Sequence, residues 1–121
     1  MSLVNRGEPA QGKRPSEFHT VWLFVLFDLP VNTQAARTRY ARFRKRLLRE
    51  GFTRLQFSVY ARHFLSEEAS GAARQRVRRL VPPAGAVRVL SITDHQFGKM
   101  ECYEGRAARP VEPAPSQLVL F

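Results

Sequence analysis

A single carboxylate, Asp28, ends a run of apolar residues and is the first candidate for chemistry. The run VWLFVLFD covers Val21–Asp28, and an ionised group beside an apolar core is costly unless something pairs with it. The sequence supports two explanations equally. Either the backbone amides of Asn32 and Thr33 donate hydrogen bonds to the carboxylate, or the carboxylate binds a cation. One carboxylate is too few for Mg²⁺, which usually takes several oxygen ligands. A two-fold dimer would present two Asp28 side chains to one ion.

Basic residues crowd the segment that follows this run. Seven of them fall within thirteen positions, and no acidic residue opposes them before Glu50. Like charges four positions apart destabilise a helix. We therefore expect nucleic-acid phosphates to neutralise these basic side chains, and the alternative is a helix face that contacts only solvent. The seven are Arg37, Arg39, Arg42, Arg44, Lys45, Arg46 and Arg49.

The composition supports a nucleic-acid partner. The chain has 121 residues, enough for one domain, with twenty Lys and Arg against ten Asp and Glu, giving a net charge of +10. Such a basic balance is typical of nucleic-acid binders, although an arginine-rich composition without a binding role is the simpler alternative. The sequence contains no glycine-rich phosphate loop, no zinc-ligand spacing and no GxSxG elbow.

The cysteine and histidine content indicates the cellular compartment and the role of the histidines. Cys102 is the single cysteine, which excludes a disulfide framework and suits a reducing compartment. With a polar first segment and no run long enough to cross a membrane, we expect a cytoplasmic protein without a membrane partner. His19, His63 and His95 are far apart in the sequence, and we expect each to be a surface or rim residue.

The elements that position these residues follow from caps and periodicity. Residues 1–19 predict a flexible basic arm, and a strand then ends at Asp28. A helix is expected from Asn32 or Thr33 to about Glu50, with Gly51 ending it. Its predicted apolar stripe is Ala36, Tyr40, Phe43 and Leu47.

The next segment, residues 52–64, alternates as a strand and is long enough that we expect a bend or bulge near Ser58 to split it. Ser66 then opens a second helix, which two prolines stop before the strand AVRVLSIT. The predicted stripe of that helix is Ala69, Ala73, Val77 and Leu80.

The order of elements predicts an α+β fold. It is a βαββαβ pattern, for which a ferredoxin-like sandwich is the common solution, and it covers residues 20–105. Residues 106–116 contain three prolines and predict an extended spacer. The apolar residues 117–121 predict an additional C-terminal strand that pairs with a sheet edge, its own or a partner's.

Four sequence blocks carry a resemblance to a known family. FDLP, LLREGF, LQFSVYARH and SITDHQFGKME together resemble the Cas-two family of CRISPR-associated proteins, in the branch found in type II systems. The resemblance covers residues 20–105. It implies a ferredoxin-like homodimer whose two sheets pack face to face, and it agrees with the fold predicted from the residues.

The resemblance also implies two activities. Family members are described as Mg²⁺-dependent endonucleases of RNA or double-stranded DNA, with Asp28 as catalytic residue and metal ligand; Mn²⁺ is the alternative ion. Phe57 and Ser58 correspond to a weaker part of that site, as do Arg37 and Arg39.

Members also bridge the subunits of the spacer-acquisition integrase and hold duplex DNA along a basic surface. A Tyr often precedes the aspartate in relatives, whereas this chain has Phe27, which lacks a hydroxyl that could position water. We therefore favour a homodimeric DNA-binding scaffold and keep the metal-dependent nuclease as the rival. A toxin-like ribonuclease that shares the fold is a third interpretation.

Overall fold

The computed structural model describes residues 20–114, so the predicted arm at 1–19 and the predicted last strand at 117–121 lie outside the described residues. The first six described elements follow the predicted βαββαβ order, which confirms an α+β sandwich. In chain order the elements are β2 (Val21–Asp28), α2 (Gln34–Arg49), β3 (Thr53–Gln56), β4 (Val59–Phe64), α3 (Glu67–Leu80), β5 (Ala86–Thr93), α4 (Asp94–Gly98), β6 (Cys102–Glu104) and β7 (Ala107–Arg109).

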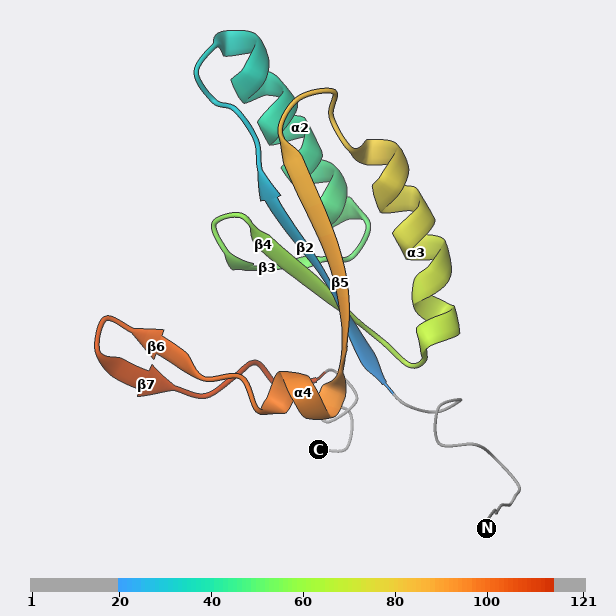
Figure 1. Cartoon of the computed structure of the whole chain (residues 1–121), viewed down its shortest axis with the longest axis vertical. Coiled ribbons are helices and arrows are strands. Elements are labelled where there is room, and N and C mark those ends of the chain that lie inside the picture. Colours follow the sequence, from blue (N-terminus) through green and yellow to red (C-terminus); the bar gives the residue numbers. More distant parts are fainter. Residues whose placement is uncertain (1–19, 115–121) are drawn as a thin grey trace.

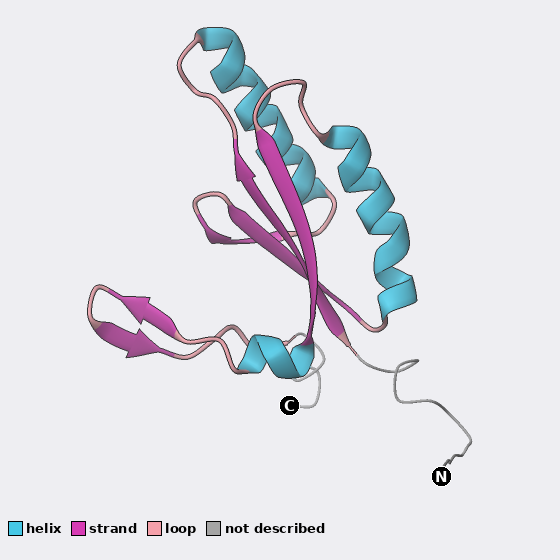
Figure 2. Ribbon diagram, in the orientation of Figure 1, coloured by secondary structure: helices cyan, strands magenta, loops and turns pink. Residues whose placement is uncertain are grey.

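The main sheet has the strand order β3-β4-β2-β5, and β2 pairs antiparallel with both of its neighbours (Figure 1). Helices α2 and α3 cover one face of this sheet (Figure 2). Leu23, Val25 and Phe27 face the helices, whereas Trp22 and Phe24 belong to a second apolar cluster on the other face. The run VWLFVLF is therefore apolar throughout because both faces of β2 are covered.

Side-chain caps begin both long helices where the sequence predicted them. Thr33 Oγ1 accepts a hydrogen bond from the Ala36 amide at 3.0 Å, and Ser66 Oγ accepts one from the Ala69 amide at 3.1 Å. The apolar stripe of α2 is confirmed, with three members buried and Tyr40 packed against the core.

The stripe of α3 needs one correction. Ala69 is exposed, and Ser70 is fully buried in its place. The Ser70 hydroxyl donates to the Glu67 carbonyl at 2.7 Å, which satisfies its donor inside the helix and makes burial of this small side chain inexpensive.

The long alternating segment is split as predicted. A tight turn at Phe57 and Ser58 separates β3 from β4, and the register of the pair shifts between Arg54 and Gln56. The alternation does not continue through the turn, so Phe57 is 67% exposed while Tyr60 is fully buried on the helix side.

Two features beyond β5 were not predicted. Helix α4 begins with a capping box, in which Thr93 and Gln96 exchange side-chain and backbone hydrogen bonds. A hairpin of β6 and β7 then turns at Gly105, whose φ is 62°, and its second strand lies in the first part of the range 106–116 that was predicted as a spacer. Proline content alone did not reveal this pairing. Within residues 20–114, no helix is long and apolar enough to cross a membrane.

Candidate metal position and nucleic-acid interface

Asp28 is exposed although its neighbours Phe27 and Leu29 are buried. It is the last residue of β2 and pairs with Ala86 of β5, so the alternation of the strand directs its side chain away from the helices. The carboxylate therefore avoids the cost of burial. Among residues 20–114 it accepts no hydrogen bond from the start of α2, where Thr33 caps the helix with its own side chain.

Gly85 fixes the backbone beside Asp28. Its φ of +99° lies in the left-handed region, and a Cβ atom at this position would lie 2.8 Å from the Asp28 carbonyl oxygen and 2.7 Å from Leu29 Cδ2. A side chain at this position would push the start of β5 away from the end of β2. The position of Asp28 thus depends on a glycine that carries no chemistry itself.

We expect Gly85→Ala to lower the free energy of unfolding by about 2–4 kcal/mol, because it combines a strained φ with a backbone clash. Gly71→Ala is the matched control: a Cβ at Gly71, inside α3, meets nothing within 4 Å. That change should raise stability by about 0.5–1 kcal/mol. Urea denaturation of both variants measures the difference, and equal stabilities would contradict the role given to Gly85.

Ser58 and Phe57 lie beside the end of β2. The Phe27 amide donates to the Ser58 carbonyl at 3.1 Å, which places the β3–β4 turn next to the strand end that carries Asp28. The Tyr40 hydroxyl lies 3.4 Å from the Phe57 carbonyl oxygen and 3.5 Å from Ser58 Oγ, and its ring stacks on Phe57 with centroids 5.7 Å apart.

The sequence pattern predicted Tyr40 only as a member of the apolar stripe of α2. Its ring also packs against Phe27, with centroids 5.8 Å apart. A phenolic hydroxyl is therefore present near this strand end although residue 27 lacks one. Only the helix packing could reveal this, because Tyr40 and Phe27 are thirteen positions apart in the sequence.

The structure separates Arg37 from Arg39. The Arg37 guanidinium donates to the Val31 carbonyl and to Gln34 Oε1, each at 3.1 Å, and so braces the loop between β2 and α2. Arg39 instead lines a groove between α2 and α3. The two side chains therefore do not converge on one site in this chain.

The basic face of α2 has no acidic partner in the part of the chain that the structure describes. Arg42, Lys45, Arg46 and Arg49 line a shallow hollow of about 490 Å³ along the helix. Within residues 20–114, none of the seven predicted basic residues of α2 forms an ion pair, whereas arginines of α3 and β7 do. Charge that the protein leaves unpaired is available to an anionic partner.

The predicted metal position at Asp28 has a single carboxylate in one chain. The described residues contain no group of three or more His, Cys, Asp or Glu side chains that could hold a metal ion. Asp28 offers one exposed carboxylate, so a metal ion held there would need further oxygen ligands from outside this chain.

Comparison with known proteins decides the family. The family model described as CRISPR associated protein Cas2 matches residues 21–100, which include the strand of Asp28, the basic helix and α4. The chain belongs to the Cas2 family.

The relatives share most of their length with this Cas2 chain. A CRISPR-associated endoribonuclease Cas2 of Parvibaculum lavamentivorans is 48% identical over 101 residues, covering 84% of this chain and all of the relative. A protein of the same name from Flavobacterium psychrophilum is 38% identical over 108 residues, covering 89% and 94%. A solved structure titled as a crystal structure of cas2 aligns with a TM-score of 0.50 and 23% identity, covering 78% and 97%, and shows the same fold.

This Cas2 chain also contains a buried histidine at the opposite end of β2. The His63 side chain is 5% exposed, and its Nε2 lies 3.8 Å from Asp94 Oδ1 and has no hydrogen-bond partner among residues 20–114. That oxygen accepts the Trp22 Nε1–H at 2.9 Å. The prediction of a surface or rim residue is therefore wrong for the His63 side chain, although the residue as a whole is half-buried. Its imidazole is enclosed because β4 pairs with β2 and because the Trp22 ring and Asp94 of α4 lie against it.

Burial lowers the pKa of His63 below 6.5, and the nearby Asp94 carboxylate opposes this only in part. As the pH falls, His63 is therefore protonated in the unfolded chain before it is protonated in the folded chain. The contribution of His63 to the free energy of unfolding should be constant above about pH 6.5 and should decrease below it. We expect His63→Phe to flatten this dependence between about pH 5 and 6.5. The exposed His95, changed to Gln, is the control, and urea denaturation across that range measures both. An unchanged pH dependence in His63→Phe would contradict this.

Proposed function

We propose that this Cas2 chain is a homodimeric scaffold that binds duplex DNA through its phosphate backbone within the spacer-acquisition integrase of a CRISPR system. The observation that carries the proposal is the unpaired basic face of α2. Arginines that contact phosphates position a protein on a duplex without selecting a sequence. A scaffold that must accept DNA of any sequence requires this kind of contact.

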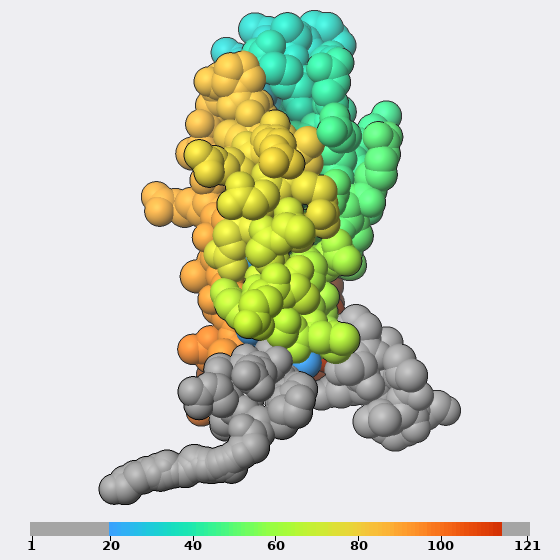
Figure 3. Space-filling view, turned by 90° about the vertical axis from the view of Figure 1, so that its right-hand side faces the viewer, coloured from blue at the N-terminus to red at the C-terminus, as the bar shows by residue number. Residues whose placement is uncertain are grey.

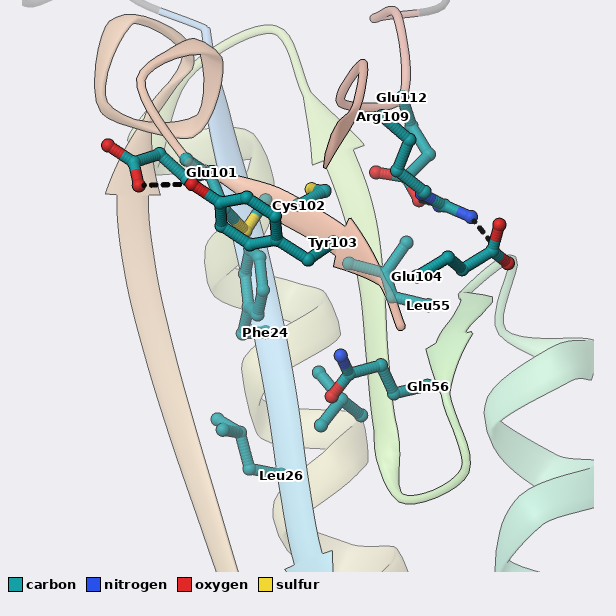
Figure 4. Close-up of a pocket in the computed structure, with 12 residues that line it drawn as sticks. Phe24, Leu26, Leu55, Gln56, Glu101, Cys102, Tyr103, Glu104, Arg109 and Glu112 are labelled. Atoms are coloured by element: carbon teal, nitrogen blue, oxygen red, sulfur yellow. Dashed lines mark hydrogen bonds and ion pairs between the residues drawn. The ribbon is translucent and has the colours of Figure 1, made fainter. Parts of the chain in front are cut away.

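The second face of the sheet supports the dimer. Leu26 is only partly buried there and Leu90 is 51% exposed, although both lie on a face that already carries an apolar cluster. A hollow of about 560 Å³ separates this face from the β6–β7 hairpin, and Figure 4 shows Phe24 of β2 and Tyr103 of β6 on its two sides. A second copy packed sheet to sheet would cover these apolar side chains.

A Mg²⁺-dependent endonuclease is the second candidate function. Its support is the exposed Asp28 carboxylate, next to the Ser58 turn, and the endoribonuclease names of the relatives. In a dimer the two Asp28 side chains would hold the ion, which supplies Lewis acidity to a phosphodiester. The hydroxyls of Tyr40 and Ser58 are the neighbouring groups that could orient water. With one carboxylate per chain at this position, the scaffold is the better-supported function.

Binding of duplexes of unrelated sequence over a salt series tests the scaffold proposal, with the wild type and the α2 variants of the Discussion side by side. Affinity should fall with salt, with a logarithmic slope of about −0.9 for each phosphate contact, and should be similar for all sequences. A salt-independent affinity, or binding to one sequence alone, would contradict the proposal.

A further inference from the structure

A narrow groove lies between α2 and the C-terminal end of α3, on the helical layer of the molecule. In Figure 3 the two helices (teal and yellow) lie next to each other on this layer. The groove has a volume of about 270 Å³ and four arginines around it. Its lining consists of Arg39, Arg42, Phe43, Arg46, Arg79, Leu80, Val81, Pro82 and Pro83.

The four guanidinium groups have no acidic partner among residues 20–114. Other arginines of α3 do find one: Arg74 pairs with Glu67 at 3.1 Å, and Arg76 pairs with Glu50. The groove therefore differs from the surroundings of Arg74 and Arg76, because arginines from two helices line one hollow without an acidic partner among residues 20–114. Mutual repulsion of these charges is relieved when an anion enters.

The groove is continuous with the basic face of α2. Arg42 and Arg46 line both the groove and the outer hollow that Lys45 and Arg49 share. A phosphate backbone lying along the outer face would therefore meet the groove at these two residues. Arg79 is the charge that the second helix adds to that path.

We propose that the groove between α2 and α3 seats a phosphate of the bound nucleic acid and that Arg79 provides the contact from α3. This rests on the proposed function and assigns one step of the path that DNA takes across the helices. The planar guanidinium fork matches two phosphate oxygens, and the apolar floor, with Phe43 only 2% exposed, reduces screening by water. The hollow is too small for a duplex and large enough for a phosphodiester group.

A phosphate fits these observations better than an acidic protein segment does. A peptide groove usually offers apolar pockets for anchoring side chains, whereas Phe43 is already buried against the core. The arginines, by contrast, come from both helices and line one shared hollow.

The test compares Arg79→Gln with Arg78→Gln in the full chain. Both changes remove one exposed charge from consecutive positions of α3, but Arg78 does not line the groove. We expect Arg79→Gln to lower the affinity for duplex DNA about twofold to fivefold and to make the logarithmic salt slope shallower by about 0.9. Arg78→Gln should change neither quantity to that extent, and Arg79→Lys should keep most of the slope.

Equal effects of the two Gln variants would overturn the groove proposal, provided that the wild type binds with the expected salt dependence. An absence of salt-dependent binding in the wild type would instead overturn the proposed function. A poly-glutamate peptide that binds in an Arg79-dependent manner, while duplex binding does not depend on Arg79, would assign the groove to a protein and also overturn the proposal. Circular dichroism of each variant confirms that it is folded.

Discussion

Replacing Arg42, Arg46 and Arg49 with Ala is expected to lower the affinity for duplex DNA about 100-fold at low salt. Each residue is exposed, lines the outer hollow of α2 and lacks an ion pair among the described residues, so each is free to contact a phosphate. Three contacts of about 1 kcal/mol combine to about two orders of magnitude in affinity. Fluorescence anisotropy across a salt series should also show a slope shallower by about 2.7 for each subunit in contact.

The matched control removes the same three charges elsewhere. Arg74 and Arg109 are already paired with glutamates, and Arg78 lines neither the outer hollow of α2 nor the groove between α2 and α3. The variant in which these three residues are changed to Ala loses the same net charge as the α2 variant. It should lose far less affinity. Similar losses in both triple variants would show that only net charge matters and would contradict a defined interface on α2.

Changing Asp28 to Asn is expected to abolish metal-dependent stabilisation of the dimer. If two Asp28 carboxylates share an ion, Mg²⁺ or Mn²⁺ stabilises the folded dimer by mass action, by about 2.7 kcal/mol when the ion is at 100 times its dissociation constant. The Asn variant keeps the shape of the side chain and removes both charges. Melting temperatures over a metal titration measure the effect, and Glu68→Gln, an exposed carboxylate on α3, is the control.

The same variant distinguishes the two candidate functions. We expect any nuclease activity to disappear in Asp28→Asn, while dimerisation, duplex affinity and integrase bridging persist, because these depend on the basic face and the sheet. Cleavage that persists would contradict the site assigned to Asp28. Loss of spacer acquisition with intact DNA binding would favour the enzyme over the scaffold.

The sequence predicted the parts of the fold that local chemistry determines. The strand of Val21–Asp28 was visible as an apolar run, and both long helices were visible from a capping hydroxyl and a stripe of the right period. Helix α4 was missed because five residues are too few to show a period, although its Thr93 and Gln96 capping box was a usable signal. The β6–β7 hairpin was missed because its strands have three residues each.

The candidate site was predictable in its residue types but not in its arrangement. Sequence position could not show that Asp28 is exposed, because its direction depends on the register with β5. Nor could it show that Arg39 lies in a groove with Arg79 while Arg37 braces a loop, because that depends on where α3 packs. The burial of His63 likewise follows from long-range pairing.

The chain's one tryptophan joins β2 to α4. Trp22 stacks on Phe97 with ring centroids 4.0 Å apart and donates its indole N–H to Asp94, and both partners belong to α4. Indole emission responds to its surroundings, so undocking of α4 would change intrinsic fluorescence while the far-ultraviolet signal of the sheet and long helices persists. Comparing the two unfolding curves would therefore show whether α4 opens separately or unfolds as one cooperative unit with the sheet.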